Sequence, residues 1–301
     1  MEAQIAGSYY PDEKDLFWYT HHPQEVMQKP SVGFDYLSRI GSDNRDYGYI
    51  SLQARLAYDE YRDKLQAQLY NAFIDLKLSN LDMWLGHNKP AIGLSSNLDN
   101  HALLQRDLSM SGLNFDRDWG TGIKLSRINP SISASLTTGS GMPLRIRESY
   151  LLASRIGWGD LPSENYSIGF SASGGEILKT MGYEIMHDEL PHSLYTAGLD
   201  FSGRLLNNYV YTDFLYGSFH EKPAYAGFVR FGYNLLPEER LAIEAQAYFQ
   251  ELAEAVSQEY SLGMNWRISA DFTLRTLYSI HQPDFEHKIA MQIYYLKGFS
   301  F

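Results

Sequence analysis

Three pairs of neighbouring residues in this sequence could take part in metal or acid–base chemistry. They are His21-His22, His187-Asp188 and His220-Glu221. Zinc sites need three or four ligands that the fold directs at one ion, and direct neighbours in sequence do not supply that spacing. Cysteine is absent, which excludes thiolate metal sites, cysteine nucleophiles and disulfides. We therefore expect no metal site and no cofactor.

The run Gly169 to Ser173 is the nearest approach to a catalytic motif. It reads Gly-Phe-Ser-Ala-Ser and lacks the final glycine of the nucleophile elbow, which is a sharp turn between a strand and a helix. Its side chains alternate between apolar and small polar types, which is typical of a strand interior. The sequence predicts that the protein is not an enzyme.

The same alternation runs through most of the chain. In residues 46–58 one face carries Ile50, Leu52, Ala54, Leu56 and Tyr58, and the pattern returns at 131–137, 166–173, 241–250 and 260–266. A period of two predicts β-strands. No stretch approaches the roughly 18 consecutive apolar residues of a membrane-spanning helix.

The two faces of these strands differ in a way that indicates a membrane barrel. The apolar face often ends in an aromatic residue, and 14% of the chain is aromatic, whereas the other face carries Gly, Ser, Gln and charges. A barrel in an outer membrane turns the apolar face to lipid, with aromatic girdles at the interfaces, and the polar face to a water-filled lumen. The carboxy-terminal segment 287–301 alternates in the same way and ends at Phe301, as the assembly signal of outer-membrane barrels does.

Short and long connections alternate along the chain. We expect short turns at 41–45, 79–81, 128–130, 160–165, 206–208, 236–240 and 267–271, and longer connections at 59–64, 90–118, 139–149, 174–193, 218–223, 252–258 and 281–286. From residue 31 onward this gives about fifteen strands, and a first strand within residues 4–20 would make an even number of about sixteen, with fourteen as the competing count. Residues 1–301 are expected to form one all-β domain, a transmembrane antiparallel barrel.

Charged residues on the polar face could select ions, because rings of charge are how pores discriminate. The strand parity directs a set of basic side chains into the lumen, which we interpret as an anion-facing ladder: Arg39, Arg55, Lys124, Arg155, Arg230 and Arg275. The alternative is that they pair with the inward acids Asp35, Asp200 and Glu244 and brace the wall.

The connection at 90–118 is too long for a simple hairpin. Loops of this length are usually functional or disordered. We expect it to fold into the lumen and set a constriction, with Lys89, Arg106 and Asp107 nearest the narrowest point; a mobile surface loop is the alternative.

Several stretches resemble the phosphate-selective porins of the porin O and porin P type. The run from Asp82 to Gly93 is similar to that family's Gly-Gln-x-Lys-x-Pro-x-Gly strand end, with His87 in place of Gln, and Arg117 to Gly122 and Leu262 to Trp266 resemble further strands. The resemblance implies a barrel of about sixteen strands and allows a homotrimer. The loops lack the dense lysine or arginine series that a phosphate trap needs, so it does not imply phosphate.

These observations predict a porin of the bacterial outer membrane, a multi-pass barrel in contact with lipid that passes small hydrophilic solutes or ions by diffusion. An alternative is a sheath around an inserted partner such as a periplasmic multihaem cytochrome, with inward glycines making room for it. The net charge of −11 argues against a nucleic-acid partner, because such proteins bind phosphates with clustered Lys and Arg. The sequence leaves open the solute, the oligomeric state and whether the lumen is occupied.

Overall fold

The computed structural model describes residues 1–20, 28–42, 45–98, 103–125, 129–181, 183–185, 190–252 and 255–299. Parts of the expected turns at 41–45 and 128–130, the residues His21, His22, His187 and Asp188, and the terminal Phe301 lie outside this set.

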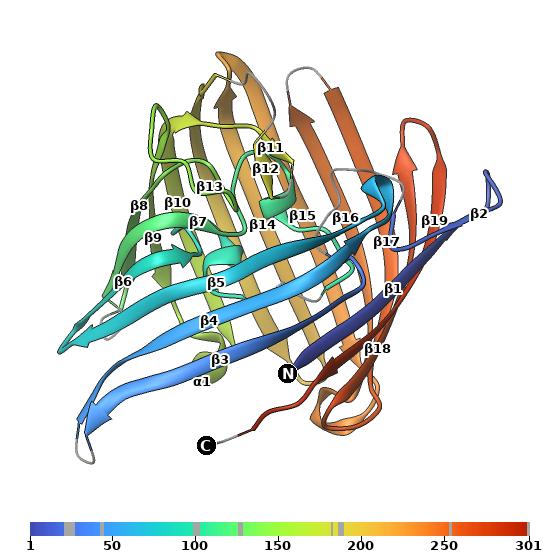
Figure 1. Ribbon diagram of the computed structural model, residues 1–301, viewed down its shortest axis with the longest axis horizontal. Helices are drawn as coiled ribbons and strands as arrows, with labels where there is room; N and C mark the ends of the chain where they lie inside the picture. Colours follow the sequence, from blue (N-terminus) through green and yellow to red (C-terminus); the bar gives the residue numbers. More distant parts are fainter. Residues whose placement is uncertain are drawn as a thin grey trace.

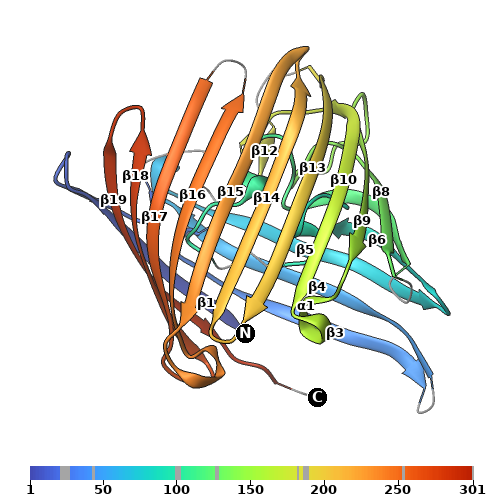
Figure 2. The same ribbon diagram turned by 180° about the vertical axis from the view of Figure 1, so that it is seen from behind.

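Within these residues the chain forms one antiparallel barrel (Figure 1). Its sixteen strands are β1 (Glu2–Tyr10), β3 (Ser31–Ser42), β4 (Arg45–Asp59), β5 (Lys64–Leu78), β6 (Leu81–Asn88), β7 (Asp118–Leu125), β8 (Ser131–Thr137), β9 (Tyr150–Trp158), β10 (Tyr166–Ile177), β13 (His192–Leu205), β14 (Asn208–Phe219), β15 (Lys222–Asn234), β16 (Leu241–Leu252), β17 (Ala255–Arg267), β18 (Phe272–Gln282) and β19 (Glu286–Leu296). Each pairs with the next in sequence, as β13 to β17 show in Figure 2.

Strand β1 closes the barrel. It pairs with β19 from Glu2 opposite Leu296 to Tyr9 opposite Ile289, and its first residues also pair with β3, Glu2 lying opposite Gly33. Pairing the first strand with the last closes the sheet, which is what a sheet that crosses lipid requires of its edge strands. The prediction of a sixteen-stranded barrel whose first strand lies in the amino-terminal segment is confirmed.

Short strands and helical turns lie at the two ends of the barrel. Strand β2 (Asp15–Phe17) pairs with β1, and β11 (Thr180–Met181) and β12 (Glu184–Ile185) form a small hairpin between β10 and β13. The helical turns are η1 (Glu60–Arg62), η2 (Leu94–Ser96), η3 (Leu108–Met110), α1 (Leu161–Glu164) and η4 (Pro237–Glu239). No helix among the described residues is long and apolar enough to cross a membrane.

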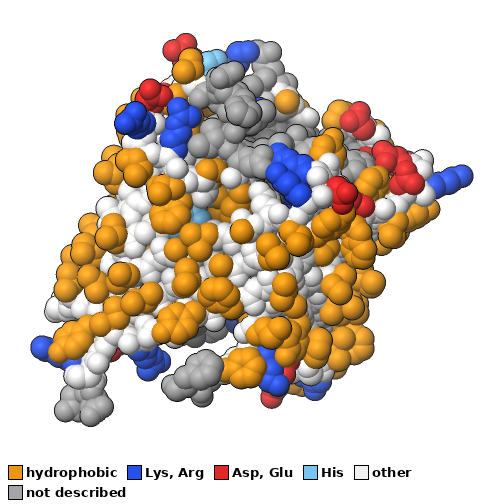
Figure 3. Space-filling model, in the orientation of Figure 1, with side chains coloured by type: hydrophobic (Ala, Val, Ile, Leu, Met, Phe, Trp, Pro, Cys, Tyr) orange, Lys and Arg blue, Asp and Glu red, His pale blue; other side chains and the backbone are white. Residues whose placement is uncertain are grey.

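The alternation in sequence becomes an outside and an inside. On β4 the side chains of Ser51, Gln53 and Arg55 are buried, whereas Ile50 and Leu56 are exposed on the outer surface. Apolar side chains cover the middle of the outer face, and charged residues gather toward its upper and lower ends (Figure 3). This distribution matches a barrel whose outer band contacts hydrocarbon.

The two ends of the barrel differ, but only part of the prediction for their connections is confirmed. The expected long connections at 90–118, 139–149 and 174–193 are long, whereas those at 59–64, 218–223, 252–258 and 281–286 leave only two to four residues between strands. The end that holds both chain termini and α1, here called the turn end, carries the short connections, for example Leu205 to Asn208 (Figure 1). The opposite end, here called the loop end, carries the longest connections together with tight hairpins such as the one from Phe219 to Lys222. Two of the long connections are used below: loop 1, residues 11–30, and loop 3, residues 89–117.

A charge placed on the outer band should destabilise the barrel according to its depth. Leu199 lies at the middle of β13 and is 58% exposed, whereas Leu205 lies at the turn end of the same strand and face and is 74% exposed. We expect Leu199→Arg to lower the free energy of unfolding in lipid vesicles by about 2–4 kcal/mol and Leu205→Arg by about 0–1 kcal/mol. Denaturant titration of both variants measures this, and equal losses would contradict the assigned depth.

Candidate functional site

Loop 3 turns into the barrel instead of extending from its rim. Its Ile92, Leu94, Leu108 and Leu113 are buried, and they pack against apolar side chains that the wall directs inward: Leu151, Ala153, Ile177, Leu194, Leu215, Phe219, Ala224, Ala226, Phe228 and Tyr248. Burying one leucine or isoleucine side chain contributes about 1.5–3 kcal/mol. The strands from β9 to β16 therefore carry apolar residues on part of their inner face because a segment of the chain covers it.

The first polar anchor of loop 3 is Asp213 on β14. The backbone N–H of Leu94 donates to Asp213 Oδ2 at 2.9 Å, inside a buried environment. Gly93 has φ +55°, and a Cβ atom there would lie 2.4 Å from the same carboxylate oxygen. Only glycine combines this backbone conformation with so close an approach. The aspartate thus determines where loop 3 begins to cross the lumen.

The second anchor is Arg106, in the second half of loop 3, here called its returning arm. Its carbonyl accepts hydrogen bonds from Gln246 Nε2 at 2.8 Å and from Arg230 Nη2 at 3.4 Å. Its guanidinium lies 4.8 Å from the centre of the Tyr248 ring and 3.7 Å from Glu259. Backbone and side chain of one residue are therefore both held to the wall formed by β15, β16 and β17.

Loop 1 also enters the lumen and touches loop 3. Gln28 Nε2 donates to the carbonyl of Leu103 at 2.8 Å, and its Oε1 accepts from Gln292 Nε2 at 2.9 Å. Gln292 Nε2 is also 2.9 Å from Gln4 Oε1, so the contact continues to the closing strand β1. The described parts of two loops thus meet inside the barrel.

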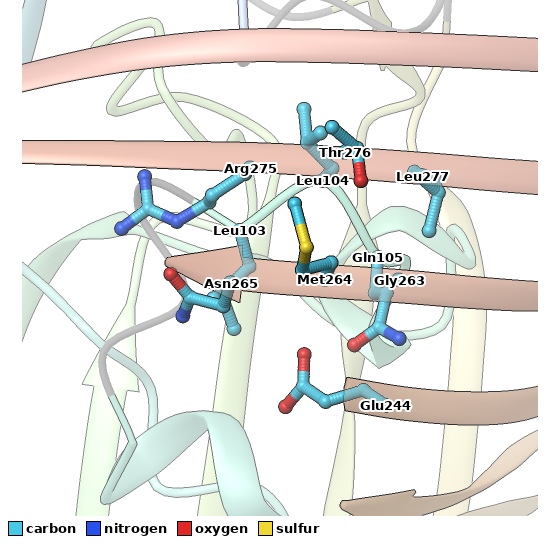
Figure 4. Close-up of a pocket in the computed structure, with 10 residues that line it drawn as sticks. All are labelled: Leu103, Leu104, Gln105, Glu244, Gly263, Met264, Asn265, Arg275, Thr276 and Leu277. Carbon is cyan, nitrogen blue, oxygen red and sulfur yellow. The ribbon is translucent and has the colours of Figure 1, made fainter. Parts of the chain in front are cut away.

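A small cavity remains where the returning arm crosses the wall (Figure 4). Its volume is about 10 Å³, which is close to the minimum that holds one water molecule. Gln105 is buried there, and neither atom of its amide has a hydrogen-bond partner among the described residues. Glu244, Asn265 and Arg275 line the same cavity, so a water molecule would find several polar partners.

The predicted basic residues lie in separate places and do not form one ladder. Arg55 donates to Gln68 at 2.7 Å, Arg230 to Gln246 at 2.7 Å and Arg275 to Gln292 at 2.9 Å. Glutamine accepts these bonds without cancelling the charge. Arg39 shares the inward parity of β3 but is exposed near the turn end.

Arg155 pairs with an inward acid, as the alternative interpretation of the basic residues expects. Its guanidinium binds Asp200 through two hydrogen bonds, Nε to Oδ2 at 2.8 Å and Nη2 to Oδ1 at 2.5 Å, and both side chains are buried. The flanking Gly169 makes room, because a Cβ atom there would lie 2.3 Å from Arg155 Nη2. This arginine braces β9 against β13.

Lys124 lines a cavity on the inside of the barrel. The cavity measures about 750 Å³ at the turn-end side of loop 3, where Leu94 and Leu98 line it together with Lys124, Arg155 and Arg204. Lys124 Nζ is 3.4 Å from Asn97 Oδ1, a long contact that leaves the ammonium group facing the cavity. Lys124 is exposed, whereas Arg55, Arg155 and Arg230 are buried.

The three predicted residues of loop 3 are held within the loop or against the wall. Lys89 donates to the carbonyl of Leu98, and Arg106 has the contacts given above. Asp107 is buried and caps η3 by accepting from the Ser109 N–H at 2.9 Å. Burial, reinforced by the charge of Asp116, raises the pKa of Asp107 above its ordinary value, while the bonds from Ser109 act in the opposite direction. Its direct effect is on the shape of the loop.

Sequence reasoning missed Asp213, Gln28 and Arg117 as site residues. Arg117 Nε donates to Asn71 at 2.7 Å, and its guanidinium lies 4.3 Å from the Tyr70 ring centre, which Arg55 approaches at 5.7 Å. Alternation could not find Asp213, because the inner face of β14 carries tyrosine and leucine as well. Gln28 lies in a loop and has no periodic pattern around it.

The close packing around Arg155 leads to a prediction on stability. Gly169→Ala would place a methyl group 2.3 Å from the guanidinium and 2.4 Å from Asp200, and should lower the free energy of unfolding by about 1–3 kcal/mol. Gly7→Ala is the matched control, since its Cβ would meet nothing closer than 3.6 Å. Denaturant titration of both variants decides this, and a Gly169→Ala barrel as stable as the control would be evidence against the close-packed ion pair.

No protein-family model matches the sequence, and no curated protein matches it. Solved structures match almost the whole chain. OmpF of Salmonella typhi in complex with daunomycin superposes with a TM-score of 0.67 at 10% identity, covering 98% of this chain and 95% of that one. OmpT of Vibrio cholerae in its trimer form gives 0.63 at 9% identity, with 98% and 96% covered. A variant of the Rh. blastica porin gives 0.58 at 9% identity, with 98% and 97% covered.

At these identities the likeness is one of fold. It supports a barrel of the porin type and does not extend to the phosphate-selective porins that parts of the sequence resemble. The chain is a sixteen-stranded antiparallel barrel with the fold of outer-membrane porins.

Proposed function

We propose that this protein is a channel of the bacterial outer membrane through which small hydrophilic solutes or ions pass by diffusion. The observation that carries the proposal is loop 3 inside a closed sixteen-stranded barrel, held to the wall at Asp213 and Arg106. A loop fixed across a lumen narrows the path without closing the barrel itself. In this arrangement the turn end faces the periplasm and the loop end faces the outside.

The constriction in this proposal lies beside loop 3. Arg106 and Lys89 contribute charge there, and Asp107 acts by holding the shape of the loop. Selection by charge takes place mainly in the turn-end cavity, where Lys124 is the basic residue least occupied by partners. Arg55, Arg230 and Arg275 each donate to a glutamine side chain on the inner wall. The channel should therefore favour small anions modestly.

The sheath for an inserted cytochrome has less support. Its argument was the set of small inward residues, and several of these make room for this chain's own side chains. A Cβ atom on Gly122 would lie 2.3 Å from the Trp84 indole nitrogen, and one on Gly157 would lie 2.6 Å from Arg155 Nη1. Loop 3 and part of loop 1 also occupy the space that a partner would need.

Two finer points belong to the proposal. A homotrimer would agree with the trimer form recorded for the Vibrio cholerae OmpT, and cross-linking in mild detergent would test it. Phosphate selectivity, suggested only by the resemblance in sequence, would require phosphate to reduce chloride current at low concentration.

Conductance in planar bilayers tests the proposed channel. We expect the refolded protein to give ohmic single-channel steps in potassium chloride, because the lumen retains a water-accessible cavity of about 750 Å³ and polar walls. Heat-unfolded protein in the same detergent is the control. Folded barrel that inserts without any current would overturn the proposal and return attention to a permanently filled lumen.

The sign of the selectivity should depend on Lys124. Lys124→Glu reverses the charge that faces the cavity, so the reversal potential under a salt gradient should move toward cations. Lys222→Glu, in the hairpin between β14 and β15 at the loop end, makes the same change in net charge far from the cavity and should have a smaller effect. Equal shifts in both variants would indicate that total charge, not the cavity, decides selectivity.

A further inference from the structure

Two histidines meet on the loop-end rim, away from loop 3. His192 is the first residue of β13, and His220 follows the last residue of β14. Their Nδ1 atoms are 3.1 Å apart, and the ring centres are 4.5 Å apart with the planes at 76°. The pair is exposed to solvent, so ions have direct access to it.

One backbone hydrogen bond and one aromatic contact hold the two histidines side by side. The N–H of His220 donates to the carbonyl of Ser193 at 2.9 Å, and Phe219 packs edge-on against His192 with the ring centres 5.8 Å apart. His220 and Glu221 have φ +52° and +63°, as the two central residues of a type I′ hairpin do. Such turns favour Asn-Gly, so histidine and glutamate here cost backbone strain that the turn itself does not require.

The separation of the two nitrogens fits metal chelation. Zinc binds histidine nitrogen at about 2.0–2.1 Å, so two such ligands stand about 2.9 Å apart at a right angle and about 3.4 Å apart at the tetrahedral angle. The observed 3.1 Å lies between these values. Without a metal ion, two neutral imidazoles can face each other in this way only if one of them carries its proton on Nδ1 and donates it to the other.

We propose that His192 and His220 form a chelate for a divalent transition-metal ion of the zinc or copper type. Imidazole suits such ions, whereas calcium and magnesium prefer oxygen ligands. Among the described residues no group of three or more His, Cys, Asp or Glu could hold a metal, so water completes the coordination. The site does not depend on the proposed channel. Sequence reasoning missed it because the two ligands are 28 positions apart and meet only across the β13–β14 hairpin.

Metal binding to the refolded, chelator-treated protein in detergent tests the site. We expect calorimetry to show one Zn²⁺ per chain, and His220→Gln or His192→Gln to weaken binding by roughly 100-fold. His287→Gln is the matched control, because His287 is also at the loop-end rim but bonds to Tyr278. It should bind Zn²⁺ as the unchanged protein does. A difference in gel mobility between heated and unheated samples shows that each variant has folded. The two histidine variants are tested separately, so the test still works if one of them does not fold.

Cu²⁺ as a paramagnetic probe adds a direct count of ligands. The unchanged protein should show hyperfine coupling to two equatorial nitrogens, and each single variant to one. Absence of Zn²⁺ binding would overturn the proposal and leave the pair as two imidazoles sharing a proton. Zn²⁺ binding that is equal in the His220→Gln variant and the unchanged protein would also overturn it, since the ion would then bind elsewhere.

Discussion

The need to pair the backbone amides of the sheet governs this structure. A sheet in hydrocarbon cannot leave an edge unpaired, and each unpaired group would cost several kcal/mol. Strand β1 meets that need by pairing with β19 along its length and with β3 at its start. Once the cylinder is closed, each strand must turn one face outward and one to the lumen, and the placement of the other side chains follows from that division.

The inner face of the barrel is not uniformly polar. On the side formed by β9 to β16, inward leucines and aromatic residues pack with loop 3 in an apolar cluster like the core of a soluble protein. Polar anchors define the position of the loop within this cluster: a carboxylate of Asp213 for one arm, and the carbonyl of Arg106 for the other. Apolar packing supplies most of the stabilisation and is tolerant of small shifts, whereas the directional hydrogen bonds determine the register of the loop on the wall.

Inward charge has two different roles in the barrel. Arg155 is neutralised by Asp200 and joins two strands, so it adds little net charge to the lumen. Arg230 binds Gln246 and the carbonyl of Arg106, and therefore holds loop 3 while keeping its charge. Lys124 lines the turn-end cavity beside Arg155, and its ammonium group makes a long contact with Asn97. Counting inward arginines would thus overstate the net charge on the lumen wall.

The sequence by itself determined the architecture, because period-two alternation over segments such as 46–58 and 131–137 was enough to predict a barrel of about sixteen strands. Connection length was predicted less well, since four of the seven connections expected to be long leave only two to four residues between strands. The sequence also located loop 3, because no hairpin needs so many residues. Only the tertiary structure decided which partners each residue has. Asp213 meets Leu94, Gln28 meets Leu103, and His192 meets His220 across gaps in sequence that depend on barrel closure and on how loops fold inward. Alternation depends on the local geometry of one strand, and it carries no information about which of its inward side chains another segment will cover.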